Sequence, residues 1–287
     1  MKISPIRYMG NKRKLINKGL CDLFPNNIDI FYDLFGGSGI VGMNVEANEY
    51  VLNELDEHVF GLYQMFKYTA PVNLINHTKD RIKEYELPTI NTDKRSVGEQ
   101  VREHYKEKYM KFRQHYNNNP NAKDLYVLMN YAMSQTMRFN KSGKFNMPFG
   151  NNRFIPETHG KEIRNFHKFL QNVTLCNKDY QGVEIERPCN SFVYLDPPYL
   201  GSVATYNENG AWDKDDNERL LKYLKDMDNK GIKWGLSNII KNKHIEDLAL
   251  IDWVKENNYN IHYFSDFDYY SFGKGKSGSV EVYIYNY

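Results

Sequence analysis

The chain has 287 residues, 41% of them hydrophobic, and a formal net charge of +2, so it can bury one large core with a smaller lobe beside it. It contains no run of eighteen apolar residues, and residues 1–5 do not resemble a secretory signal, so we expect neither a membrane nor a secreted protein. Its cysteines, Cys21, Cys176 and Cys189, are far apart and lack metal-ligand spacing. We therefore expect a reduced, cytoplasmic protein with no metal site.

Strand-like and helix-like segments alternate along most of the chain, which predicts an α/β fold. The expected elements are a helix at 11–24, a strand at 29–34, a helix at 39–48, a strand at 51–54, a helix at 57–68, strands at 173–176 and 191–195, a helix at 214–229, and strands at 232–236, 260–267 and 279–285. Between residues 70 and 170 the alternation stops. We expect this stretch to form a mainly helical insert with a β-hairpin projecting at 138–150.

Charge is distributed unevenly between the insert and the rest of the chain. Residues 60–170 contain 19 lysines and arginines against 10 aspartates and glutamates, a net of +9, while the remainder has 19 against 26, a net of −7. A concentrated positive charge of this kind is expected where a protein lies against phosphates. The alternative is that residues 102–115 are simply the solvated face of a charged helix.

A glycine-rich turn follows the first expected strand. The segment Phe-Tyr-Asp-Leu-Phe-Gly-Gly-Ser-Gly at 31–39 lacks the Lys-Ser/Thr of a phosphate-binding loop and the full spacing of a dinucleotide site. The second strand ends at Glu54, whose carboxylate can accept both hydroxyls of a ribose. Together they indicate an adenosine-containing cofactor that needs no phosphate cradle, and S-adenosylmethionine fits this description.

The segment Asp-Pro-Pro-Tyr at 196–199 directly follows an apolar strand. Two prolines fix the backbone and remove two N–H donors, so the Asp196 carboxylate and the Pro197 carbonyl form a rigid pair of acceptors. With Tyr199 beside them, these groups could hold the exocyclic amine of a planar base while the ring stacks. The alternative is an ordinary proline turn with Tyr199 in the core.

These motifs, in this order, resemble a Dam-type (D12 class, alpha group) N6-adenine DNA methyltransferase. Four stretches carry the resemblance, at 5–12, 33–39, 138–150 and 196–199, and the ending at 281–287 also resembles the final strand of that family. The resemblance implies a Rossmann-like methyltransferase sheet that binds S-adenosylmethionine. It also implies a catalytic domain of residues 1–68 and 171–287, and a target-recognition domain of residues 69–170 that binds double-stranded DNA.

The resemblance also assigns cofactor contacts. Lys12 can pair with the methionine carboxylate, Glu54 should hold the ribose, and Asp179 should accept from the adenine amine beside the ring of Tyr180. Asn53 or Asp56 could share the role of Glu54, and Asp179 and Tyr180 could instead be a helix cap and a core residue. The full set of expected cofactor residues is Tyr8, Lys12, Asp33, Phe35, Gly36, Gly37, Ser38, Glu54, Asp179, Tyr180 and Asp196.

For catalysis, the resemblance and the chemistry of an aromatic amine imply one arrangement. A flipped adenine would donate its amine hydrogens to Asp196 and the Pro197 carbonyl, with Pro198 stiffening the turn and Tyr199 stacking on the ring. DNA contacts are expected from Arg7, Arg138, Asn140, Lys141, Lys144 and Pro148. Arg138 could read guanine and Pro148 touch a thymine methyl, or Arg138 could clamp a phosphate and Pro148 merely end the hairpin.

Other functions remain possible from sequence alone. Pro188-Cys189 superficially resembles the nucleophile of C5-cytosine methyltransferases, but it lacks the glutamine that follows there and stands beside an intact Asp-Pro-Pro-Tyr. An N4-cytosine methyltransferase usually has Ser in place of Asp196. An RNA substrate and an inactive DNA-binding relative are further alternatives. A cognate restriction endonuclease is a candidate partner in a bacterial or phage-encoded system.

Overall fold

The computed structural model describes residues 1–199, 212–241, 247–264 and 280–287. Within them, the strands form one seven-stranded sheet in the order β3-β2-β1-β4-β5-β7-β6. The strands are β1 (Ile28–Asp33), β2 (Ala47–Asn53), β3 (Val173–Cys176), β4 (Ser191–Leu195), β5 (Lys233–Lys241), β6 (Asn260–Tyr263) and β7 (Val280–Tyr285). The first five pair in parallel, whereas β7 runs antiparallel to β5 and β6.

The strand order reverses between β1 and β4. From β1 the chain proceeds outward through β2 and β3 on one side, and from β4 through β5 on the other. In such sheets ligands bind beyond the carboxyl ends of the strands at this reversal, because the loops there diverge and leave a crevice. The topology alone therefore locates the candidate site beside the ends of β1 and β4.

Helices complete the fold around this sheet. They are α1 (Arg13–Asn17), α2 (Ile40–Met43), α3 (Glu57–Tyr68), α4 (Pro71–Glu84), α5 (Lys94–Val97), α6 (Glu99–Asn118), α7 (Ala122–Tyr131), α8 (Pro156–Leu170), α9 (Lys214–Asn229) and α10 (Leu248–Glu256), with short 3-10 turns η1 (Leu20–Leu23), η2 (Met133–Gln135), η3 (Tyr180–Gly182) and η4 (Pro188–Asn190). Among the described residues, no helix has both the length and the apolarity needed to cross a membrane.

Alternating side chains of the central strand β4 pack into two different hydrophobic cores. Val193 and Leu195 of β4 pack with Leu220 of α9 and Leu250 of α10. The intervening residues of β4 face the other side, where they join a core that contains residues of α1 and α2. This period of two explains why β4 is apolar throughout, since a strand covered on both faces has no solvent-facing positions.

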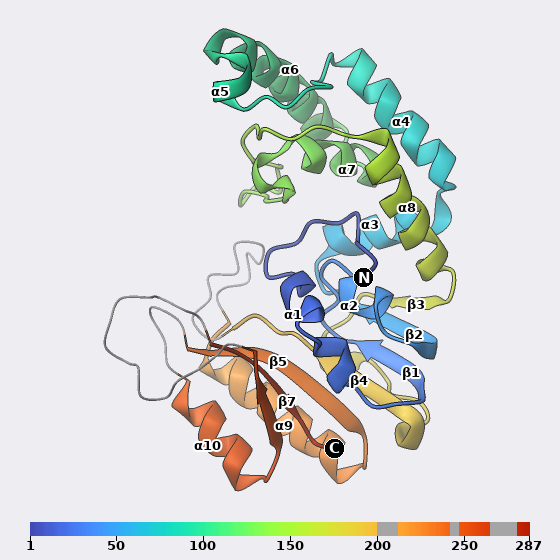
Figure 1. Ribbon diagram of the computed structural model, residues 1–287, viewed down its shortest axis with the longest axis vertical. Coiled ribbons are helices and arrows are strands. Elements are labelled where there is room, and N and C mark those ends of the chain that lie inside the picture. The colour runs from blue at the N-terminus through green and yellow to red at the C-terminus, as the bar shows by residue number, and fades with distance from the viewer. Residues whose placement is uncertain (200–211, 242–246, 265–279) are drawn as a thin grey trace.

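The insert lies at the opposite end of the molecule from α9 and α10 (Figure 1). Its helices α7 and α8 pack on α3, and one continuous apolar core runs from Leu52 of β2 through Phe66 of α3 to Phe166 of α8 and Leu128 of α7. This shared core joins the insert to the sheet. The proposed division into two domains, at residues 68/69 and 170/171, stays a prediction.

The helices at 57–68 and 214–229 and the strands at 173–176 and 191–195 were predicted correctly, and the insert is mainly helical as expected. The predicted helix at 11–24 was wrong in part. It is interrupted at Gly19, whose φ of +89° lies in the left-handed region that glycine enters without steric cost. The remainder continues only as the 3-10 turn η1.

Other boundaries also differ from the predictions, including the second strand, which was expected at 51–54 and spans Ala47–Asn53. The helix expected at 39–48 ends at Met43, because pairing of Ala47 with Ile28 already begins β2. The fifth strand extends to Lys241 because it also pairs with β7, and the helix α10 was not predicted, although Asp247 caps its start. Of the terminal strands, 260–263 and 280–285 are described, and the rest of the predicted ranges, apart from Phe264, lies outside the described residues.

The predicted hairpin at 138–150 is less regular than expected. Phe139 pairs with Phe145, and Ala132 with Phe149, only as isolated bridges. Several backbone groups of the segment 145–150 bond to side chains of α6 instead of to a partner strand, so a regular two-stranded ladder does not form.

Candidate active site

Three carboxylates follow the carboxyl ends of adjacent parallel strands. Asp33 is the last residue of β1, Glu54 follows β2, and Asp196 follows β4. Asp33 pairs with Tyr194 in the sheet, so Asp196 lies just beyond it along the neighbouring strand. The strand register therefore gathers all three carboxylates at the reversal of the sheet.

These residues line a cavity of about 340 Å³. That volume falls within the range of about 300–1,000 Å³ typical of ligand pockets. Its wall includes every expected cofactor residue and the whole segment 196–199, together with other residues such as Met9, Leu55, Trp212 and Arg219. Segments that are far apart in the sequence thus meet around one cavity, and their individual roles stay predictions.

The glycine turn forms one wall of the cavity. Gly37 has a φ of +52°, and a side chain there would come within 3.0 Å of the Tyr8 ring, so both the backbone conformation and the close contact favour glycine. The Gly37 N–H donates to Glu54 Oε2 at 2.8 Å, and Tyr63 donates its hydroxyl hydrogen to the Gly37 carbonyl. These bonds hold the turn in place against the end of β2.

Lys12 connects the N-terminal segment to Asp196. Its Nζ lies 2.5 Å from Asp196 Oδ2 and donates to the Tyr199 hydroxyl at 2.8 Å and to the Gly10 carbonyl at 3.0 Å. The Tyr199 hydroxyl in turn donates to Asp196 Oδ1 at 3.2 Å. An ammonium has three N–H bonds, and Lys12 already has three acceptors here. Its expected role in binding the cofactor carboxylate therefore stays a prediction.

Burial and charge shift the acidity of this group. Burial alone would lower the pKa of Lys12, but the neighbouring Asp196 charge raises it above its ordinary value. Burial raises the pKa of Asp196, and the ammonium of Lys12 opposes that increase. Lys12 thereby favours the ionised form of Asp196, which is the form that can accept hydrogen bonds from an amine. The Asp196 side chain is 19% exposed, so a substrate can reach it.

At the other two carboxylates, Asp33 and Glu54, positive charge opposes the effect of burial on the pKa less than it does at Asp196. Burial, with repulsion from Asp196 and Glu54, raises the pKa of Asp33 to about 8. Burial also raises the pKa of Glu54 to about 7, although it accepts hydrogen bonds from the N–H groups of Asp56 and Gly37. Within the described part of the chain, Asp33 Oδ1 is buried and has no hydrogen-bond partner. A cationic ligand would supply the missing charge and donor.

Asp179 and Tyr180 line the cavity but also have the structural roles given as alternatives. Asp179 caps η3 by accepting from the Gln181 N–H, and it pairs with Arg219 at 3.1 Å. Tyr180 is buried, and its ring lies 5.2 Å from that of Phe35. Asp179 Oδ1 and Oδ2 are thus both engaged, and the expected contact with an adenine amine stays a prediction.

Asn53 and Asp56 do not share the position of Glu54. Asn53 is buried, donates to the carbonyls of Leu34 and Lys178, and accepts from the Lys178 N–H. Asp56 caps α3 by accepting from two backbone N–H groups. Both side chains therefore hold the backbone around the site, as Glu54 also does through its bonds to Gly37 and Asp56. All three residues line the cavity, so the assignment of the ribose contact to Glu54 stays a prediction.

Sequence reasoning missed Trp212 and Arg219. The Trp212 ring lies edge-on to Phe35 at 6.1 Å, and Arg219 lies over the Tyr180 ring at 5.0 Å. Trp212 precedes the capping box of α9, and Arg219 lies in the second turn of that helix. The local pattern identifies the helix, but it does not show which of its residues face the cavity.

The expected DNA contacts divide into two groups. Arg7 points inward, since its guanidinium donates to both oxygens of Glu162 on α8 at 2.8 Å and to the Ser4 carbonyl. Asn140 holds the turn of the hairpin by accepting from the N–H groups of Ser142 and Lys144. The remaining side chains, Arg138, Lys141, Lys144 and Pro148, are exposed.

The hairpin lies beside the cavity wall. Phe139 stacks on His58, with 3.6 Å between the ring centroids and 11° between the planes. His58 is the second residue of α3, two positions after the cavity residue Asp56. Phe139 therefore holds the hairpin close to the start of α3, beside the cavity residue Asp56. Across the described ranges, no three His, Cys, Asp or Glu side chains are grouped as metal ligands.

Comparison with known proteins identifies similar sequences along nearly the whole chain. Residues 8–268 match the D12 class N6 adenine-specific DNA methyltransferase family. Modification methylase StsI of Streptococcus sanguinis and Type II methyltransferase M.FokI of Planomicrobium okeanokoites are each 33% identical over 293 residues, which is 99% of this chain and 43% of the relative. The chain thus spans less than half the length of these two relatives.

A third relative matches over most of its own length. Type II methyltransferase M.MjaIII of Methanocaldococcus jannaschii is 28% identical over 83% of this chain and 85% of that protein. Among solved structures, the tRNA (m1A58) methyltransferase TrmI from Aquifex aeolicus aligns over 99% of this chain and 72% of its own, with a TM-score of 0.36 and 8% identity. That similarity is too low to support an argument, and the α/β assignment rests on the sheet itself.

Proposed function

Because the chain belongs to the D12 class N6 adenine-specific DNA methyltransferase family, we propose that it transfers a methyl group from S-adenosylmethionine to N6 of an adenine in double-stranded DNA. The observation that supports this most directly is the cavity, which has the glycine turn on one wall and Asp196 on another. A donor bound at the turn and a base held by Asp196 would lie next to each other.

The cavity suits S-adenosylmethionine, which supplies an electrophilic methyl group on a sulfonium when bound. Asp33 has an unpartnered buried oxygen that could accept from the cofactor ammonium, and the turn at Gly37 gives a ligand close access to the backbone. Glu54 would accept from the ribose hydroxyls, and Tyr180 would contact the adenine ring. The three acids also favour a ligand of net positive charge.

The target adenine would leave the duplex, because N6 cannot meet a methyl donor in this cavity while the base remains stacked. Its amine would donate to the Asp196 carboxylate and to the carbonyl of Pro197, and Tyr199 would stack on the base. Asp196 would thereby orient the nitrogen lone pair toward the methyl group, and Lys12 would keep Asp196 ionised. Asp196 Oδ1 already accepts from the Tyr199 hydroxyl, and its second lone pair could accept from the amine.

The exposed hairpin residues Arg138, Lys141, Lys144 and Pro148 would contact the DNA, and the basic insert would lie along the phosphates. Two of the relatives carry the names of type II methyltransferases, so we further propose that the protein acts with a cognate restriction endonuclease in the cytoplasm of its host. This pairing is separate from the chemistry of the cavity, and a test of one does not test the other.

The proposal is tested with purified protein, isotope-labelled S-adenosylmethionine and unmethylated genomic DNA, followed by digestion to nucleosides. We expect label in N6-methyladenine, and its loss in Asp196→Ala while cofactor binding weakens far less. Asp252→Asn, at an exposed position on α10, is the matched control and should keep full activity. Label in N4-methylcytosine would overturn the choice of base. Cofactor binding without transfer to DNA would favour an RNA methyltransferase or an inactive relative.

A further inference from the structure

The segment 145–151, which follows the hairpin turn, lies along one stripe of α6. Four side chains of the helix bond to it, in antiparallel order: Asn117 to Phe145, Arg113 and Tyr109 to Met147, and Arg102 to the stretch 149–151. Their spacing of seven, four and four residues keeps them on one face of the helix. Two of the arginines that contribute to the basic charge of the insert are thus bonded inside it.

The segment itself alternates between buried and exposed residues. Phe145, Met147 and Phe149 are 1%, 7% and 5% exposed and face the core. Two of the expected DNA contacts are exposed, Lys144 immediately before Phe145 and Pro148 between Met147 and Phe149, while Asn146 is partly exposed. Because side chains of an extended segment alternate with a period of two, a shift of one residue against α6 would exchange the two sets. The register of 145–151 therefore decides which side chains could meet DNA.

Asn117 is the residue best placed to fix that register. Its Oδ1 accepts from the Phe145 N–H at 2.8 Å, and its Nδ2 donates to the Phe145 carbonyl at 3.1 Å. The side-chain amide thus pairs with both backbone groups of one residue, as a neighbouring strand would. Tyr109 and Arg113 each donate to the Met147 carbonyl, and either could donate to another carbonyl if the register changed. The Asn117 amide is more restrictive, because it must match a donor and an acceptor of one residue.

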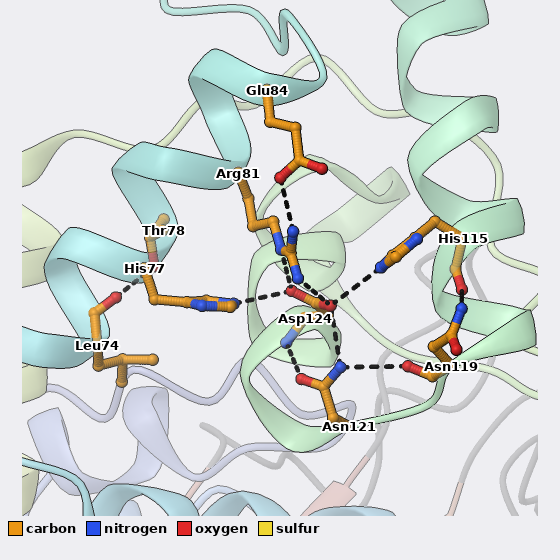
Figure 2. Close-up of polar contacts among 9 residues, drawn as sticks. All are labelled: Leu74, His77, Thr78, Arg81, Glu84, His115, Asn119, Asn121 and Asp124. Carbon is orange, nitrogen blue, oxygen red and sulfur yellow. Dashed lines mark hydrogen bonds and ion pairs between the residues drawn. The ribbon is translucent and has the colours of Figure 1, made fainter.

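Helix α6, which carries Asn117, is itself held in place by a buried carboxylate. Asp124, at the start of α7, is fully buried and lies within 2.8 Å of His77 Nε2 and Arg81 Nε, both on α4 (Figure 2). Its other oxygen accepts from Asn121 and lies 3.8 Å from Nε2 of His115 on α6, two residues before Asn117. Helices α4, α6 and α7 therefore converge on one carboxylate, which gives Asn117 a fixed support.

We propose that Asn117 is a positioning residue for sequence recognition, which sets the register of segment 145–151 and thereby presents Lys144 and Pro148 to the DNA. This inference rests on the proposed function, since it assumes that the hairpin meets DNA. It assigns no contact with substrate to Asn117 itself.

The test compares Asn117→Ala and Asn117→Asp with Asn118→Ala, which changes an exposed neighbour on the same helix turn. Methylated sites are mapped on a library of random duplexes to give the preference for the best site over its single-base variants. We expect this preference to fall about tenfold in Asn117→Ala, the scale of one lost base contact. Asn117→Asp, which keeps the acceptor but loses the donor, should lie between it and the wild type, and Asn118→Ala should match the wild type.

A second measurement separates register from general damage. Hydrogen exchange at the Phe145 amide should accelerate in Asn117→Ala, while calorimetric affinity for S-adenosylmethionine stays unchanged. Accelerated exchange with undiminished site preference would overturn the inference, as would unaltered exchange. If the wild-type protein itself methylates no adenine, the proposed function fails instead, so the two failures are distinct.

Discussion

The ion pair between Arg7 and Glu162 offers a direct test of how the N-terminal segment is used. Arg7 was expected to contact DNA, yet its guanidinium donates to both carboxylate oxygens of Glu162 and to the carbonyl of Ser4. The Ser4 hydroxyl donates to the carbonyl of Ser38 in the glycine turn. A continuous set of hydrogen bonds thus runs from α8 of the insert to the wall of the cavity.

The free-energy cost of breaking the bonds between Arg7 and Glu162 follows from the burial of Glu162. The Glu162 side chain is 8% exposed, so Arg7→Ala would leave a nearly buried carboxylate without its counter-charge, whereas Arg7 itself is 29% exposed and partly screened. Bonds to charged groups contribute about 1.5–3 kcal/mol each, and screening places the net loss here near the lower end, at about 2 kcal/mol in the free energy of unfolding. For a chain of 287 residues, that corresponds to a melting temperature lower by about 3 °C.

The assay is urea and thermal unfolding of the free protein, with calorimetric S-adenosylmethionine binding alongside. Arg7→Ala should be destabilised and should bind the cofactor more weakly, and Glu162→Gln should behave similarly. Combining the two changes should cost less than the sum of the single effects, because both remove one interaction. Arg13→Ala, which removes an exposed arginine on α1, is the matched control. Unchanged stability with weakened DNA binding would refute this reasoning and restore Arg7 as a DNA contact.

Three further predictions concern charged groups. Because burial raises the pKa of Asp33 to about 8, the folded protein retains a proton that the unfolded chain has lost above about pH 4. Stability should therefore fall as pH rises from about 4 to 8, and Asp33→Asn should reduce that fall in urea unfolding; identical pH dependence in the variant would contradict the assignment. Lys12→Met should move the acid limb of the methyl-transfer profile to higher pH, because Lys12 opposes the burial that raises the pKa of Asp196, and an unmoved limb would count against this role. Asp124→Asn should lower the free energy of unfolding by about 3 kcal/mol, since it removes a fully buried charge from between His77 and Arg81, and an unchanged urea midpoint would show that the cluster contributes little.

The sequence determined the features whose causes are local. The helix-like patterns gave α3 and α9 their correct ranges, and the strand-turn pattern at 31–39 identified the glycine wall of the cavity. The acids at the ends of β1, β2 and β4 line one cavity, because the carboxyl ends of parallel strands share one edge of a sheet. The same local reasoning failed at Gly19, where the helical pattern continues but a left-handed residue ends the helix.

Only the tertiary structure decided which charged groups pair. Lys12 pairs with Asp196 and Arg7 pairs with Glu162, both far away along the chain, and in each case several other acids were available in the sequence. The pairing is fixed by where the β-strands and α8 place each backbone, which no periodicity encodes. For the same reason, an arginine or asparagine on the basic helix α6 cannot be assigned from sequence to a phosphate or to a carbonyl of the neighbouring segment. The distinction depends on which face of the helix the segment 145–151 covers.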